Sequence, residues 1–165
     1  MGKCRVNKIL IRGIPDAVEL STLNLPFLEE LILDYNNFTG NIPNLNNLTN
    51  LKILNLGVNN FTGSLPDLSN LNQLEEINLS QNELEDVITD YPNQPNLKIL
   101  DISDNQLTGE IPNFDNNTEL HQLNVSGNLL TGSIPDFQNI PNLNYLNVSG
   151  NQLTGTIPNL SLIHI

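Results

Sequence analysis

Residues 143–158 read Leu-Asn-Tyr-Leu-Asn-Val-Ser-Gly-Asn-Gln-Leu-Thr-Gly-Thr-Ile-Pro, and this stretch returns along the chain with different filler residues. Earlier copies start at Leu28, Leu51, Leu74, Leu97 and Leu120, each 23 residues after the last. A fixed period of this size is typical of a solenoid, in which every repeat forms one turn and stacks on its neighbours. Positions within a repeat are numbered below from its leading leucine.

Positions 4 and 6 of each repeat carry aliphatic side chains, and the residues at positions 5 and 7 are mostly polar. This alternation predicts a short strand with one buried face. Strands this short must pair side by side, so the sequence predicts a parallel sheet along one side of the solenoid. Apolar rows at positions 11 and 18 are expected to complete the core. The position 18 row is Leu45, Leu68, Tyr91, Phe114 and Phe137.

Position 9 is asparagine in every copy, at Asn36, Asn59, Asn82, Asn105, Asn128 and Asn151. An amide side chain offers two N–H donors and a carbonyl acceptor, so it can satisfy backbone groups where the chain leaves the sheet. Because buried polar groups need partners, we expect these amides to form an internal ladder with a structural role.

Each repeat also tends to carry Thr-Gly at positions 12 and 13 and Ile-Pro or Leu-Pro at positions 15 and 16. The full pattern, Leu-x-x-Leu-x-Leu-x-x-Asn-x-Leu-Thr-Gly-x-Ile-Pro, resembles the plant-type leucine-rich repeat over residues 28–158 and more weakly over 6–27. The resemblance implies a right-handed, β-rich repeat solenoid of the α/β type. Such a horseshoe has a concave parallel sheet and extended or 3₁₀ segments on its convex side. The repeat here is one residue shorter than the plant-type unit.

The pattern makes residues 1–159 a single solenoid domain. A degenerate repeat at 6–27 precedes full repeats at 28–50, 51–73, 74–96, 97–119 and 120–142, and a partial repeat covers 143–159. Residues 160–165 break the pattern and resemble a translated sequencing adapter, so we expect a non-native tail there. Extracellular members of the resembled family often carry a disulfide-bonded cap where Cys4, the only cysteine, stands alone. We therefore expect a fragment truncated at both ends.

Acidic residues dominate the composition, with 18 Asp and Glu against 6 Lys and Arg and a formal net charge of −12. Such a surface repels phosphate groups, so we expect neither nucleic acid nor an anionic membrane as a partner. The same charge favours a basic partner. No apolar stretch approaches about 18 residues, so this fragment is not expected to insert into a membrane.

No motif for catalysis, metal binding or cofactor binding stands out. His121 and His164 are the only histidines, and neither accompanies residues in the spacing of a metal site or a catalytic triad. An acidic cluster in the third repeat matches no calcium-binding loop, which favours a solvated patch. That cluster is Glu83, Glu85, Asp86 and Asp90. The sequence therefore predicts no enzyme, no metal and no cofactor.

Asn-x-Ser/Thr sequons recur in three columns of the repeat, at positions 5, 10 and 20. They are Asn37, Asn47, Asn60, Asn78, Asn116, Asn124 and Asn147. A repeat rich in Asn and Thr produces sequons by chance, but a secretory-type fold favours glycosylation at these sites. Column 5 faces outward from the sheet, so glycans at Asn78, Asn124 and Asn147 would cover part of the concave face.

The concave face supplies the candidate binding residues. Position 3 carries Ile53, Ile99 and Tyr145, apolar side chains of the kind that anchor interfaces, although single exposed apolar residues are also common elsewhere. The candidate partner-binding residues are Glu30, Tyr35, Lys52, Ile53, Glu76, Lys98, Ile99, His121 and Tyr145.

The resemblance implies a non-catalytic recognition module, extracellular or at the cell surface. It would bind a protein, peptide or glycan through the concave and lateral surfaces. The alternative is a glycosylated structural solenoid that self-associates through uncapped ends or binds ice. A threonine column at position 12 could match an ice lattice, but Glu85 interrupts it, and Thr before Gly also belongs to the turn of this family. The column is Thr39, Thr62, Thr108, Thr131 and Thr154.

Overall fold

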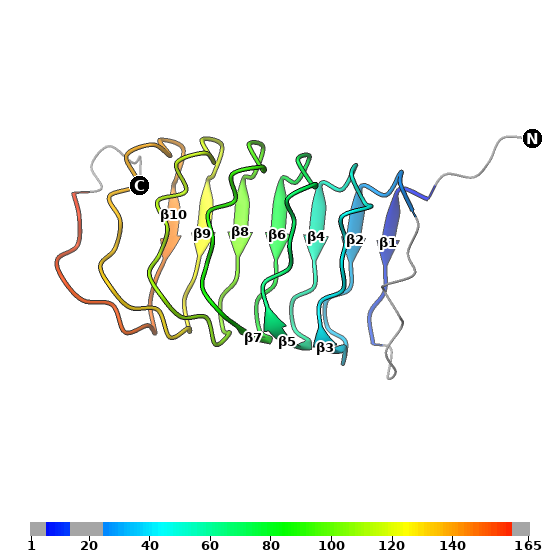
Figure 1. The fold of residues 1–165 in the computed structure, drawn as a ribbon, viewed down its shortest axis with the longest axis horizontal. Helices are drawn as coiled ribbons and strands as arrows, with labels where there is room; N and C mark the ends of the chain where they lie inside the picture. Colours follow the sequence, from blue (N-terminus) through cyan, green and yellow to red (C-terminus); the bar gives the residue numbers. More distant parts are fainter. Residues whose placement is uncertain (1–5, 14–24, 160–165) are drawn as a thin grey trace, which may run out of the picture.

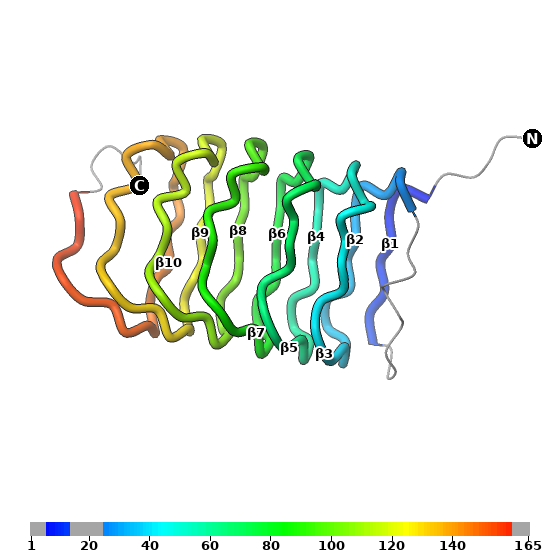
Figure 2. The backbone as a smooth tube through the Cα atoms, in the orientation of Figure 1, coloured from blue at the N-terminus to red at the C-terminus, as the bar shows by residue number. Residues whose placement is uncertain are grey.

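The computed structural model describes residues 6–13 and 25–159 as one coil of stacked turns (Figure 2). Each turn contributes one strand to a seven-stranded parallel sheet, in the order β1-β2-β4-β6-β8-β9-β10. The strands lie side by side in chain order along the coil (Figure 1). Their bounds are Lys8–Leu10 (β1), Glu30–Ile32 (β2), Ile53–Asn55 (β4), Glu76–Asn78 (β6), Ile99–Asp101 (β8), Gln122–Asn124 (β9) and Tyr145–Asn147 (β10). The predicted parallel sheet is confirmed.

The register of this sheet follows the repeat. Leu31 pairs with Leu54, Leu54 with Ile77 and Ile77 with Leu100, so position 4 forms one buried row across the strands. A one-residue slip would turn these side chains to solvent, so burial of one face fixes the register. We call the solvent-exposed side of this sheet the concave face.

A second, three-stranded parallel sheet was not predicted from the sequence. It contains β3 (Thr39–Asn41), β5 (Asn60–Ser64) and β7 (Glu83–Glu85), in the order β3-β5-β7. Isolated parallel bridges continue it into later repeats, at Val87↔Thr108, Glu110↔Thr131 and Ser133↔Thr154. The strands lie along the lower edge of the coil in Figure 1, where the Thr-Gly segments of successive turns run side by side.

The core fills the space between the concave strands and the convex segments. Every member of the position 18 row is buried, as the apolar pattern predicts. Of the two conformations expected on the convex side, the described residues adopt the extended one, interrupted by single turns such as that closed by the Leu48 N–H on the Leu45 carbonyl (2.9 Å). No helix among the described residues is long and apolar enough to cross a membrane. Cys4, His164 and the expected tail at 160–165 lie outside the described residues.

The asparagine ladder is present as predicted. Asn59 illustrates it: its Nδ2 donates to the carbonyls of Leu56 (3.0 Å) and Leu33 (2.9 Å), and its Oδ1 accepts from the Phe38 N–H (3.1 Å). Each amide thus joins its own repeat to the one before it. The same connections recur at Asn82, Asn105, Asn128 and Asn151.

Candidate recognition surface

Position 3 of the repeat forms a continuous row across the concave face. The parallel register aligns its members directly from β2 to β10, and they are Glu30, Ile53, Glu76, Ile99, Gln122 and Tyr145. Acidic and apolar side chains alternate over the first four strands of the row. Ile53 and Ile99 are partly buried, whereas Tyr145 is 48% exposed. Neighbouring strands are about 4.8 Å apart, so the two isoleucines lie roughly 10 Å from one another.

Position 2 forms a second row, in which charges alternate and pair. Lys52 Nζ lies 2.9 Å from a Glu29 carboxylate oxygen, and Lys98 Nζ lies 2.7 Å from Glu75. The hydrogen bond and charge of Glu29 raise the pKa of Lys52. All four side chains are substantially exposed, so these pairs add little to stability. The glutamates neutralise Lys52 and Lys98, the two lysines predicted to bind a partner, so neither lysine is a free positive charge.

Tyr35 lies beside an ion pair at the end of the concave face. Arg12 donates two hydrogen bonds to the Asp34 carboxylate, at 2.7 and 2.8 Å, and its guanidinium lies 5.9 Å from the Tyr35 ring centroid. Tyr35 is 63% exposed and has a φ of 56°, a left-handed conformation that is uncommon for a residue with a side chain. An exposed aromatic ring against an arginine is a frequent interface anchor.

The structure therefore places all the predicted partner-binding residues on or beside one face. Glu30 is also paired, with Lys8, and His121 immediately precedes β9. Sequence reasoning missed Gln122, which shares the position 3 row, and Arg12, which supports Tyr35. The repeat pattern places Gln122 on the concave face, but it was not among the candidate binding residues. Arg12 lies in the degenerate first repeat, at the position equivalent to its partner Asp34, but the pattern does not show that the two side chains pair.

The sequons of column 5 belong to a polar ladder on the concave face. Asn124 Nδ2 donates to Asp101 Oδ2 and Ser103 Oγ, both at 3.2 Å, and Asn124 Oδ1 accepts from Ser126 Oγ at 2.8 Å. In the next strand, Asn147 Nδ2 donates to Ser126 Oγ at 3.2 Å. A glycan would be attached to the same Nδ2 atom that makes these bonds, so the Asn-x-Ser pattern has a structural explanation here. The sequon asparagines Asn37, Asn47, Asn60 and Asn116 are exposed.

Most of the unbalanced charge lies away from the concave face. From Leu28 onward, positions 9 to 23 of the described repeats contain acidic residues and no lysine or arginine. These acids are Asp67, Glu83, Glu85, Asp86, Asp90, Glu110, Asp115, Glu119 and Asp136. Within the described part of the chain, no three His, Cys, Asp or Glu side chains are grouped to hold a metal ion. The lateral and convex surfaces are thus the more negative ones.

The threonine column at position 12 makes hydrogen bonds within the fold. Thr108, Thr131 and Thr154 donate through Oγ1 to backbone carbonyls of the preceding repeat, at 3.2 to 3.3 Å. These bonds run beside the isolated bridges of the second sheet. They give the column a structural role, within the second sheet and not within a turn.

Family models for the leucine-rich repeat match residues 27–48, 50–71, 95–139 and 142–161. The solved structure of pollen receptor kinase 3 is 33% identical to this chain with a TM-score of 0.81, over 93% of this chain and 77% of that one. The chain belongs to the leucine-rich repeat family. Its repeats are of the plant type, as the resemblance implied, and they match ectodomains of plant receptor kinases.

Other similar structures show the range of this repeat family. The Arabidopsis receptor kinase HAESA, solved with the peptide hormone IDA and the co-receptor SERK1, is 39% identical with a TM-score of 0.75, over 82% of this chain and 24% of that one. A plant ice-binding protein is 27% identical with a TM-score of 0.68, over 94% of this chain and 60% of that one. The leucine-rich repeat chain described here thus spans about a quarter of the HAESA chain. No curated protein matches it.

Proposed function

We propose that this leucine-rich repeat domain is a non-catalytic recognition module that binds an extended peptide or a protein segment across its concave face. The observation that carries the proposal is the aligned row of Ile53, Ile99 and Tyr145 between acidic and amide side chains. An extended chain crossing the strands would meet apolar and polar positions in turn. Apolar anchors surrounded by polar groups are the usual arrangement of an interface.

The similarity to receptor ectodomains supports this proposal. The HAESA structure contains a peptide hormone and a co-receptor, and another similar structure is a plant peptide hormone receptor, RGFR1, with RGF2. By this similarity we also propose an extracellular or cell-surface location. The proposal includes glycans at the seven sequons, with the exposed asparagines as the more accessible sites.

The test is selection of peptides from a displayed random library on the purified domain, followed by binding to variants. We expect most selected peptides to lose at least tenfold in affinity for the Ile53→Ala, Ile99→Ala, Tyr145→Ala triple variant. Gln138→Ala, an exposed change on the convex side, serves as the matched control and should leave affinity unchanged. Circular dichroism verifies that both variants fold. Peptides that bind the triple variant as tightly as the parent would contradict the proposal.

Similarity to the plant ice-binding protein supports a second candidate function, recognition of ice. The internal hydrogen bonds of the threonine column and its interruption by Glu85 count against it. Thermal hysteresis of the purified domain decides the matter. We expect none above that of an equal concentration of an unrelated acidic protein.

A further inference from the structure

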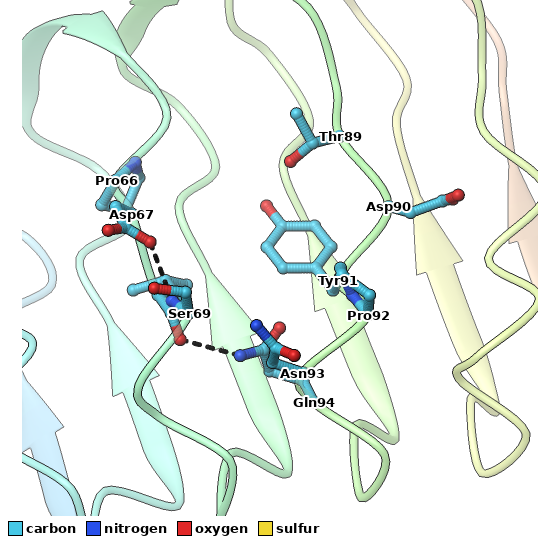
Figure 3. A pocket seen from close by; sticks show the side chains of 10 residues that line it. Pro66, Asp67, Ser69, Thr89, Asp90, Tyr91, Pro92, Asn93 and Gln94 are labelled. Carbon is cyan, nitrogen blue, oxygen red and sulfur yellow. Dashed lines mark hydrogen bonds between the residues drawn. The ribbon is translucent and has the colours of Figure 1, made fainter.

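A pocket of about 200 Å³ opens on the convex side between the second and third repeats (Figure 3). Residues 66–69 form one wall and residues 89–94 the other. The walls are joined by the side chain of Gln94, whose Nε2 donates to the Leu68 carbonyl at 2.7 Å. This volume is below the roughly 300 Å³ of typical small-molecule sites, and it suits the end of a single side chain.

Tyr91 belongs to the second wall, and its hydroxyl has no hydrogen-bond partner among the described residues. The residue is only 4% exposed, and burial raises the pKa of its hydroxyl, which therefore stays neutral. Figure 3 shows the hydroxyl directed toward the space between Pro66 and Thr89. The other repeats have Leu or Phe at this position, so the solenoid does not need the oxygen. An unpartnered buried hydroxyl costs stability, and a group that reached it would gain a hydrogen bond.

Asp67 and Asp90 are the charged groups that line the pocket. Asp67 Oδ1 accepts from the Ser69 N–H at 2.9 Å, Oδ2 accepts from Asn46 Nδ2 at 3.1 Å, and the Ser69 hydroxyl is a third donor, which leaves the carboxylate about one further acceptor site. Pro66 and Pro92 have no backbone N–H to offer. The Asp90 carboxylate points away from Tyr91 in Figure 3 and accepts from the Phe114 N–H. A donor on an incoming group can therefore bond to Asp67, and an acceptor can bond to the Tyr91 hydroxyl.

We propose that this pocket, which we call the Tyr91 pocket, binds a lysine or arginine side chain of a partner polypeptide. The cationic head would donate to the Asp67 carboxylate and to the Tyr91 oxygen. A peptide carbonyl of the same partner would accept the hydroxyl proton, which a simple polyamine could not do. The surrounding surface carries acids and, in the described repeats, no base, so it attracts a basic segment. Since the hydroxyl is itself buried, we expect a small side-chain movement on binding.

The site is separate from the concave face, so its test does not depend on the function proposed above. The probe is N-acetyl-lysine methylamide, titrated into the isotopically labelled domain and followed by NMR. Its uncharged counterpart is N-acetyl-norleucine methylamide, which has a similar shape. We expect saturable shifts at Ser69, Tyr91 and Gln94 with the lysine probe, in the millimolar range, and no saturation with the norleucine probe.

Variants distinguish a site from general attraction to an acidic surface. Asp67→Asn should weaken the lysine probe at least fivefold and Tyr91→Phe at least twofold. Asp136→Asn, the equivalent aspartate of the fifth repeat, lies outside the pocket and should leave its affinity unchanged. Phe occupies the same position at Phe114 and Phe137, so Tyr91→Phe is compatible with the fold. Equal losses in the Asp67 and Asp136 variants, equal binding of the norleucine probe, or no shifts at the pocket would each overturn the proposal.

Discussion

The side-chain carbonyl of Asn82 accepts a hydrogen bond from the backbone N–H of Phe61 in the preceding repeat, at 3.0 Å. Its Nδ2 donates to the carbonyls of Leu56 and Leu79. Asn82→Ala leaves these buried backbone groups without partners, so we expect the free energy of unfolding to fall by about 3 kcal/mol or more. Urea unfolding followed by circular dichroism measures the change. Asn70→Ala, at an exposed position, should stay within about 0.5 kcal/mol of the parent.

Val58→Gly should stabilise the domain. Val58 has a φ of 55°, and a left-handed backbone is especially unfavourable for a β-branched residue. The equivalent residues of the fifth and sixth repeats are Gly127 and Gly150, also with positive φ. Relief of this strain outweighs the greater freedom of glycine in the unfolded chain, so we expect a gain of about 1 kcal/mol in urea unfolding.

The matched control for this change is Val87→Gly. Val87 is exposed and takes part in a parallel bridge with Thr108, with no positive φ. Glycine there should lower the free energy of unfolding by about 0.5 to 1 kcal/mol. A loss of similar size at Val58 would show that the left-handed conformation at position 8 is not strained.

Tyr91→Phe should raise the stability of the unliganded domain. The change removes a buried hydroxyl without a partner and retains the ring that fills the core. We expect an increase of about 1 kcal/mol in the free energy of unfolding. Tyr35→Phe, at an exposed tyrosine, is the control and should change it little. A destabilised Tyr91→Phe variant would mean that the hydroxyl already has a partner within the domain.

Asp67 should contribute to stability in a pH-dependent manner. Hydrogen bonds from the backbone and hydroxyl of Ser69 and from Asn46 lower the pKa of Asp67 from its usual value of 3.8. A carboxyl group with a lowered pKa stabilises the fold above its unfolded value, and this contribution is lost as the pH falls through the folded value. The parent should therefore be more stable than Asp67→Asn at pH 6, and the difference should shrink below about pH 4. A difference that is the same at pH 6 and at pH 3 would contradict this assignment.

The regular part of the fold was predictable because every repeat has the same pattern of apolar and polar residues. Leu31, Leu54 and Ile77 occupy position 4 at an interval of 23 residues, which specifies both the parallel sheet and its register. The Asn ladder was predictable for the same reason, since one buried amide per repeat needs partners at one repeat distance. The second sheet was missed because Thr-Gly-x segments have no period-two apolar pattern, and their pairing depends on backbone groups alone.

The sequence predicted which residues lie on the concave face, but it did not predict the interactions between them. The alternation of apolar and polar residues placed Glu30, Lys52 and Lys98 on the concave side. It could not show that glutamate carboxylates neutralise both lysines. Tyr91 was assigned to the core as one member of an apolar row. Its hydroxyl has no partner within the described part of the chain and lies beside a pocket. This arrangement depends on the spacing between two convex segments, which the repeat pattern does not specify.

Because each turn pairs only with the turns before and after it, the number of turns is free to change. Unequal recombination could remove 23 codons, starting at any position within a repeat. The product would lack one complete turn, and the equivalent strands on either side of the deletion would pair in the correct register. The Tyr91 pocket would not survive as easily, because its two walls come from one particular pair of turns. A gene built in this way can lengthen or shorten its product without loss of foldability, while a feature formed at a junction between turns is lost whenever that junction is recombined.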